Sequence, residues 1–123
     1  MTVVDSAASV TLDRSALLGT WANTNANGSV VTITIGDADD GRLWIEATGL
    51  RNWGRVEGHA YAFNFDDRAA GAFDAVWDLG FMEVRMQANV KLGVLVVVTL
   101  NHFRDESGRS SYFDREFYHR VKP

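Results

Sequence analysis

Signals for a turn recur about every ten residues along this chain, and the segments between them have the length of single strands. The glycine-containing turn signals lie at 25–28, 37–41, 49–54, 91–93 and 105–109. Between two of them, Val31, Ile33 and Ile35 alternate with the more polar positions around them, which is the period of two expected of a half-buried strand. This spacing predicts a succession of short antiparallel strands and no long helix.

The pattern divides the chain into eight expected strands. They span residues 19–24, 29–35, 42–48, 55–65, 72–79, 81–90, 94–104 and 110–120. Eight sequential strands joined by short hairpins can close into a barrel, which removes the exposed sheet edges. We therefore predict an all-β fold, an eight-stranded antiparallel up-and-down barrel over 13–123, with an N-terminal arm over 1–12 and a short helical turn at 13–18. A two-sheet sandwich of the same strands is the alternative.

The composition of the chain limits the kinds of molecule that it can bind. The chain has 123 residues, 46% of them apolar, which is enough for one buried core. A net charge of −4 provides no basic surface for nucleic acid, and the absence of cysteine excludes disulfides. No basic segment followed by an apolar run opens the chain, so we expect a cytoplasmic protein that does not bind membranes.

A short motif on the first expected strand carries a family resemblance. Gly19-Thr20-Trp21 resembles the Gly-x-Trp signature of the calycin superfamily, and the chain is most similar in appearance to avidin- and streptavidin-like barrels. The segment 73–77 resembles the strand that presents a tryptophan to the ligand, and 116–123 resembles the closing strand and tail. The resemblance implies a barrel with a ligand-holding lumen, in which Arg120 covers Trp21 as a structural pair.

Two departures from the avidin pattern concern the ligand. The segment 94–104 contains no tryptophan, and Glu116 stands where the resemblance requires an aspartate near the ligand. The resemblance therefore does not imply biotin binding.

Which face of each strand lines the lumen depends on register, because a slip of one residue exchanges the two faces. One solution turns the apolar faces inward, so that the lumen and its ligand site are lined by Tyr61, Phe63, Phe73, Trp77, Met82, Met86, Leu100, His102, Phe113, Arg115 and Phe117. The alternative, avidin-like register instead places Glu83, Arg85, Gln87, Glu116 and Tyr118 inside. Its exterior would be apolar over the last three strands and would require a homodimer or higher homo-oligomer.

Motifs for enzyme chemistry are absent from the sequence. It contains no phosphate-binding glycine loop, no nucleophile elbow and no His-Glu-x-x-His, and His59, His102 and His119 lie on separate expected strands. We therefore expect no cofactor and no metal site.

Three functions are compatible with such a barrel. The first is a binding protein that holds a small apolar or aromatic molecule in its lumen. The second is a cofactor-independent cyclase or isomerase of bacterial secondary metabolism, which would fold a polyene or polyketide-like substrate there and use Arg115, His102 or Tyr61 as catalytic groups. The third is a sugar- or protein-binding barrel that uses Trp44 and Trp53 near its loops.

Overall fold

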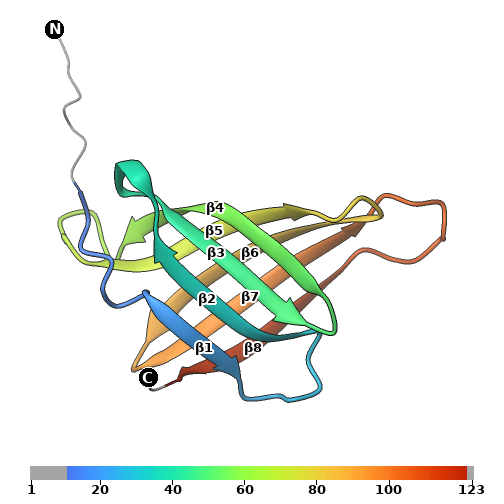
Figure 1. Cartoon of the computed structure of the whole chain (residues 1–123), viewed down its shortest axis with the longest axis horizontal. Coiled ribbons are helices and arrows are strands. Elements are labelled where there is room, and N and C mark those ends of the chain that lie inside the picture. The colour runs from blue at the N-terminus through green and yellow to red at the C-terminus, as the bar shows by residue number, and fades with distance from the viewer. Residues whose placement is uncertain (1–10, 122–123) are drawn as a thin grey trace, which may run out of the picture.

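A computed structural model describes residues 11–121 as a closed barrel of eight antiparallel strands (Figure 1). Each strand pairs with the next along the chain, and the last pairs with the first, so the order is up-and-down. The strands are β1 (Gly19–Asn23), β2 (Val30–Asp37), β3 (Leu43–Gly49), β4 (Asn52–Ala62), β5 (Ala70–Asp78), β6 (Met82–Lys91), β7 (Val94–Phe103) and β8 (Tyr112–Arg120). The predicted all-β barrel is confirmed.

The short helical turn expected at 13–18 corresponds to a single hydrogen-bonded turn, in which Leu17 N and Leu18 N both donate to Arg14 O, and β1 begins directly after it. Within residues 11–121 the one helical element is a short 3-10 turn, η1 (Asp39–Gly41), and no helix there is long and apolar enough to cross a membrane. The loop expected at 49–54 is shorter than the sequence predicted, because β4 already pairs with β3 from Asn52.

The centre of the barrel is filled with side chains. Trp21, Phe73, Trp77 and Met86 are at most 2% exposed and pack in one cluster with aliphatic residues of β2, β3, β6 and β7. A fully buried large side chain contributes roughly 1.5–3 kcal/mol relative to an exposed one, so this cluster is the main stabilising feature. Any space for a ligand must therefore lie toward one end of the barrel.

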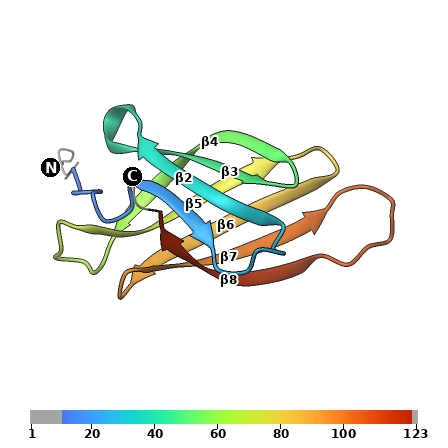
Figure 2. The same cartoon turned by 60° about the horizontal axis from the view of Figure 1, so that its bottom comes forward.

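One end of the barrel is closed by the segment that precedes β1. Leu17 is fully buried beneath Trp21, whose Nε1 donates to Leu17 O at 2.9 Å. The guanidinium of Arg120 lies 4.4 Å from the Trp21 ring centre and donates to the carbonyl oxygens of Ala16 and Leu18. The expected pairing of Arg120 with Trp21 is thus present, and it ties β8 to the closing segment. Figure 2 shows this segment and the C-terminal end of β8 at the same end of the molecule.

The apolar-inside register is correct for β6 and wrong for β7 and β8. Met82, Val84, Met86 and Ala88 are buried, as that register requires. The residues of β7 and β8 that it placed inside lie on the outer face: Leu100, His102, Phe113, Arg115 and Phe117.

The cause of this reversal is the turn between β6 and β7. Because the turn contains only Leu92 and Gly93, Val90 is paired directly with Leu95. Directly paired residues point to the same face, so the inner face of β6 continues onto Leu95 and its alternate neighbours. Both faces of the first half of β7 are apolar, and hydrophobicity alone therefore could not fix the register.

The avidin-like register is correspondingly right for β8 and wrong for β6. Tyr118 is 2% exposed and Glu116 is half-buried on the inner face, whereas Glu83, Arg85 and Gln87 lie on the outer face.

Tyr61 and Phe63 also lie outside the lumen, 49% and 51% exposed. Ala60 is paired with the buried Phe73, so the next residue, Tyr61, points outward, where its hydroxyl donates to Asp74 at 2.7 Å. The Phe63 ring packs against Gly71, at the position that a Cβ on that glycine would take.

Candidate functional site

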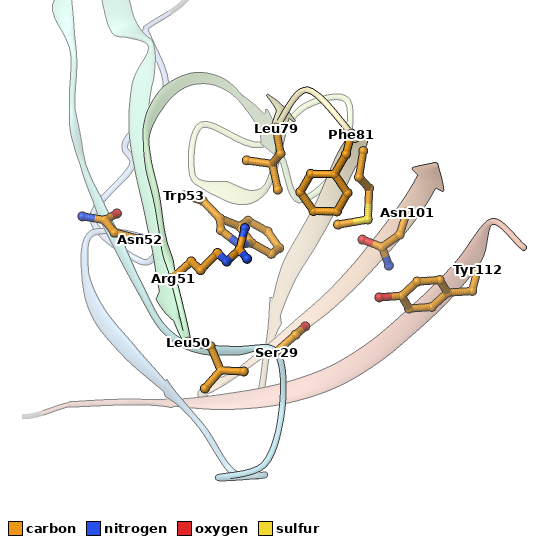
Figure 3. A pocket seen from close by; sticks show the side chains of 10 residues that line it. Ser29, Leu50, Arg51, Asn52, Trp53, Leu79, Phe81, Asn101 and Tyr112 are labelled. Carbon is orange, nitrogen blue, oxygen red and sulfur yellow. The ribbon is translucent and has the colours of Figure 1, made fainter. Parts of the chain in front are cut away.

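The end of the barrel opposite Arg120 contains a cavity of about 360 Å³ (Figure 3). Side chains from the β1–β2, β3–β4 and β5–β6 connections meet there with the ends of β7 and β8. The lining residues are Ser29, Leu50, Arg51, Asn52, Trp53, Leu79, Phe81, Met82, Asn101 and Tyr112. We call this space the mouth cavity. Its volume lies at the lower end of the range of small-molecule sites, roughly 300–1,000 Å³.

The floor of the mouth cavity is aromatic and rigid. Trp53 meets Trp77 edge to face, with ring centres 5.5 Å apart and an interplanar angle of 65°. Trp77 is in turn fixed by a hydrogen bond from its Nε1 to Gly54 O at 3.0 Å. Met82, 8% exposed, extends the apolar floor. An apolar or aromatic guest would therefore contact pre-positioned rings.

The rim beside β7 and β8 is also aromatic. Phe103 and Tyr112 lie with ring centres 6.0 Å apart. The guanidinium of Arg109 lies 4.2 Å from the Phe103 ring centre and 5.8 Å from that of Phe81, and Asp105 holds it by an ion pair of 2.8 Å. These rings thus already accept one cation from the chain itself.

A polar wall descends from the mouth cavity along the inner faces of β7 and β8. The paired residues Asn101 and Tyr112 form its top row, and Thr99 and Asp114 form the row below. Asn101 is 4% exposed, and its Nδ2 donates to Thr99 Oγ1 at 3.2 Å. Ser29 lines both the mouth cavity and a narrow space of about 10 Å³ in front of Asp114, so the two spaces adjoin.

Below Asp114, Glu116 anchors the connection between β1 and β2. Its two carboxylate oxygens accept hydrogen bonds from Asn23 Nδ2 and Asn25 Nδ2, both at 3.1 Å. A Cβ at Gly28 would stand 2.5 Å from both Asn23 Nδ2 and Glu116 Oε1. A glycine is therefore required where the β1–β2 connection comes closest to the Glu116 carboxylate. Glu116 therefore has a structural function here.

Tyr118 completes the polar wall at its deepest point. Its hydroxyl donates to Val30 O at 3.2 Å. Burial raises the pKa of Tyr118 well above its ordinary value of 10.0, and the negative charges of Glu116 and Asp114 raise it further. The phenol thus remains protonated as a neutral donor.

The residues proposed from the sequence are divided among three places. Met82 lines the mouth cavity, whereas Phe73, Trp77 and Met86 belong to the filled core. Glu116 and Tyr118 lie in the polar wall. The others lie on the outer face: Tyr61, Phe63, Glu83, Arg85, Gln87, Leu100, His102, Phe113, Arg115 and Phe117.

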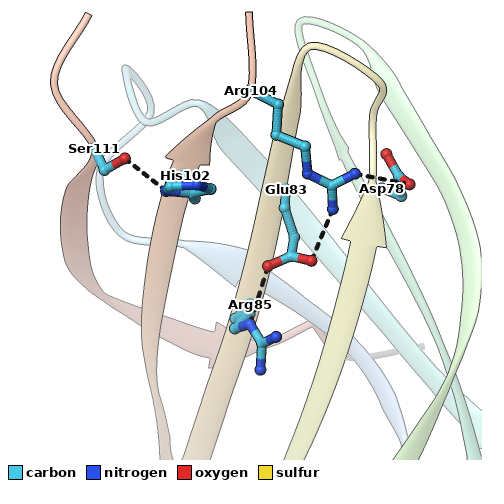
Figure 4. A network of polar contacts seen from close by, with 6 residues as sticks. All are labelled: Asp78, Glu83, Arg85, His102, Arg104 and Ser111. Carbon is cyan, nitrogen blue, oxygen red and sulfur yellow. Dashed lines mark hydrogen bonds and ion pairs between the residues drawn. The ribbon is translucent and has the colours of Figure 1, made fainter.

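On the outer face, an ion-pair network joins β5, β6 and the end of β7 (Figure 4). Arg104 donates to Asp78 at 3.1 Å and to Glu83 at 2.8 Å, and Glu83 also accepts from Arg85 at 3.0 Å. The pKa of Asp78 is held below its ordinary value by the hydrogen bond from Gly80 N and then by Arg104, and the pKa of Glu83 is lowered by Arg85 and Arg104. His102 Nδ1 lies 2.9 Å from Ser111 Oγ nearby. Glu83, Arg85 and His102 therefore serve this surface and do not reach the mouth cavity.

Most of the residues that line the mouth cavity were not singled out from the sequence. Trp53 was expected near the loops. The apolar-inside register placed Asn101 and Tyr112 on the outer face, whereas the avidin-like register placed Tyr112 on the same inner face as Glu116 and Tyr118. The two-residue spacing of the 92–93 turn contained the missing information, because it fixes the register of β7 relative to β6.

The structure between residues 11 and 121 brings no three His, Cys, Asp or Glu side chains together in a way that could hold a metal ion. No protein-family model matches the chain, and neither a curated protein nor a solved structure is significantly similar to it. Its resemblance to calycins remains a prediction that rests on Gly19, Trp21 and the pairing of Arg120 with Trp21.

Proposed function

We propose that this protein is a small-molecule-binding barrel that holds a largely apolar or aromatic ligand in the mouth cavity. One observation carries the proposal: a space of about 360 Å³, open to solvent on one side, is lined largely by apolar and aromatic side chains, with the buried amide of Asn101 among them. Sites of this kind usually combine an apolar lining with a few placed polar groups that orient the ligand.

A cofactor-independent cyclase or isomerase is less well supported. Its proposed catalytic groups were Arg115, His102 and Tyr61, and all three are on the outer face of the barrel wall. The mouth cavity retains Tyr112, Asn101 and Ser29 as polar groups, which suffice to orient a ligand. Binding without conversion therefore requires fewer assumptions.

A sugar- or protein-binding function through Trp44 and Trp53 is also less well supported. Arg55 covers the Trp44 ring at 3.6 Å from its centre, which blocks the stacking surface that a sugar would use. Trp53 lines the mouth cavity and packs against Trp77. The two tryptophans therefore do not form a common surface.

Thermal unfolding in the presence of a panel of apolar and aromatic compounds tests the proposal. A ligand that binds only the folded state at a hundred times its Kd stabilises it by about 2.7 kcal/mol, which is a shift of several degrees for a domain of this size. Phe81→Ala removes a lining ring and should weaken binding of any hit about tenfold. Phe65→Ala, which removes a fully exposed ring from the β4–β5 loop, is the matched control and should leave binding unchanged.

Two results would overturn the proposal. One is a panel in which no compound raises the Tm. The other is a hit whose affinity responds equally to Phe81→Ala and Phe65→Ala, because that ligand would bind elsewhere.

A further inference from the structure

We infer that the mouth cavity selects ligands that present a positively charged nitrogen, such as a primary ammonium group, on an aromatic or apolar body. The inference rests on the proposed binding function and specifies the chemistry of its ligand. It differs from the expectation from the sequence, in which the positively charged Arg115 lay inside the lumen.

The first argument is the sign of the charge inside the barrel. Arg115 points outward, and the inner face of β8 instead carries Asp114 and Glu116. Glu116 is occupied by Asn23 and Asn25. Within residues 11–121, no side chain forms a hydrogen bond or ion pair with the Asp114 carboxylate, so Asp114 is the carboxylate on this inner face that is available to a ligand.

The second argument is the position of Asp114 below the mouth cavity. Asp114 follows Tyr112 by two residues on the same face, which places it roughly 7 Å further into the barrel. Ser29 borders both the mouth cavity and the narrow space in front of Asp114. A slender head group such as an ammonium fits this geometry, because the space of about 10 Å³ does not admit a ring.

The third argument is the buried amide of Asn101. Its Nδ2 is used by Thr99, and no group among residues 11–121 donates to its Oδ1. Oδ1 is not one of the fully buried polar atoms that lack a partner, so it keeps contact with solvent, and an N–H from a ligand can take the place of water there. Figure 3 shows the Asn101 side chain directed toward the space between Phe81 and Tyr112. Asn101 and Asp114 together offer acceptors, which suit an ammonium and not a carboxylate.

The aromatic rim already holds a cation of the chain itself, because the guanidinium of Arg109 lies over Phe103 and Phe81. The basic groups near the opening are Arg51 and Arg109, both exposed and therefore screened by solvent. Asp114 is only partly exposed, so its charge is screened less than theirs.

Three indole compounds with the same ring and different charge test the inference. Tryptamine carries an ammonium, 3-ethylindole is neutral and indole-3-propionate carries a carboxylate at pH 7. Calorimetric titration should show tryptamine binding at least about tenfold more tightly than 3-ethylindole, since a charge-assisted hydrogen bond contributes that much or more. Indole-3-propionate should bind most weakly.

The variant Asp114→Asn keeps the shape of the side chain and removes its charge. It should reduce the preference for tryptamine over 3-ethylindole to about threefold or less, with little change in the affinity for 3-ethylindole. Asp66→Asn, in the loop between β4 and β5 at the other end of the barrel, is the matched control and should leave the preference intact. Circular dichroism would establish that both variants are folded.

The outcomes separate the two proposals. If 3-ethylindole binds as tightly as tryptamine, or if Asp114→Asn leaves the preference unchanged, the inference is wrong and the binding function stands. If none of the three compounds binds and none of the wider apolar panel raises the Tm, both proposals fail.

Discussion

At the scale of single residues, Tyr118 shows how the polar wall affects stability. The phenol is buried next to two carboxylates, and its native pKa is raised above the ordinary value of 10.0. Between pH 10 and the higher native pKa, the unfolded chain has lost this proton while the native protein keeps it. The native state then binds more protons, so the free energy of unfolding falls as the pH rises.

The variant Tyr118→Phe should remove this pH dependence. At neutral pH it should cost about 1 kcal/mol, because the hydrogen bond to Val30 O is lost. Above pH 10 its free energy of unfolding should fall less steeply than that of the wild type, by up to about 1.4 kcal/mol per pH unit. Urea unfolding of the wild type and of Tyr118→Phe at pH 8, 10 and 11 measures how the free energy of unfolding changes with pH in each protein. An equally steep fall in both proteins above pH 10 would contradict the argument.

A second prediction at this scale concerns Gly36. Its Cβ, if present, would overlap the ring of Trp44 on the paired position of β3, and the guanidinium of Arg55 stacks on the same ring. Gly36→Ala should therefore cost about 1–3 kcal/mol, because Trp44 must move and its stacking with Arg55 is disturbed.

A double-mutant cycle isolates this contact. In the Trp44→Ala background the overlap is gone, and Gly36→Ala should change the free energy of unfolding by less than about 0.5 kcal/mol. Equal costs in the two backgrounds, measured by urea unfolding, would show that the ring does not limit this position.

At the scale of elements, the β6–β7 hairpin determines which side chains of β7 point into the barrel. Its turn residues Leu92 and Gly93 both have positive φ, 52° and 79°. A two-residue turn of this kind favours asparagine followed by glycine, whereas leucine is strained there. Leu92 is 94% exposed and gains no packing in return.

Leu92→Asn should therefore stabilise the protein by about 0.5–1.5 kcal/mol, seen as a higher Tm. Leu92→Ala retains the positive φ on a residue with a Cβ and serves as the control without this gain. If the two variants have the same Tm, strain at this turn is not a significant cost.

The same hairpin explains how far the sequence could predict this fold and site. Turn spacing and strand alternation were sufficient for the eight strands, and Gly19, Trp21 and Arg120 for the closed end. The mouth cavity was not predicted, because Val94–Val98 are apolar on both faces and hydrophobicity did not distinguish the inner side. Counting two turn residues between Lys91 and Val94 would have placed Asn101, Tyr112 and Asp114 inside.

At the scale of the whole molecule, the register leaves an apolar patch on the outside of the barrel. Leu100, Phe113 and Phe117 are 45%, 68% and 47% exposed, and Val96 and Val98 lie between them on the same outer face. Arg115 lies between the two phenylalanines, and its aliphatic part can pack on their rings. Contiguous apolar patches of this kind mark interaction surfaces in soluble proteins.

A second copy of the chain offers the same apolar patch, and two copies related by a two-fold axis would cover both at once. We therefore expect a homo-oligomer in solution, whose mass by size-exclusion chromatography with light scattering corresponds to at least two chains. The double variant Phe113→Ser/Phe117→Ser should shift the mass toward one chain, whereas Phe65→Ser, which removes a fully exposed ring from the β4–β5 loop, should not. A wild-type protein that elutes with the mass of one chain at micromolar concentration would show that the patch remains open to solvent.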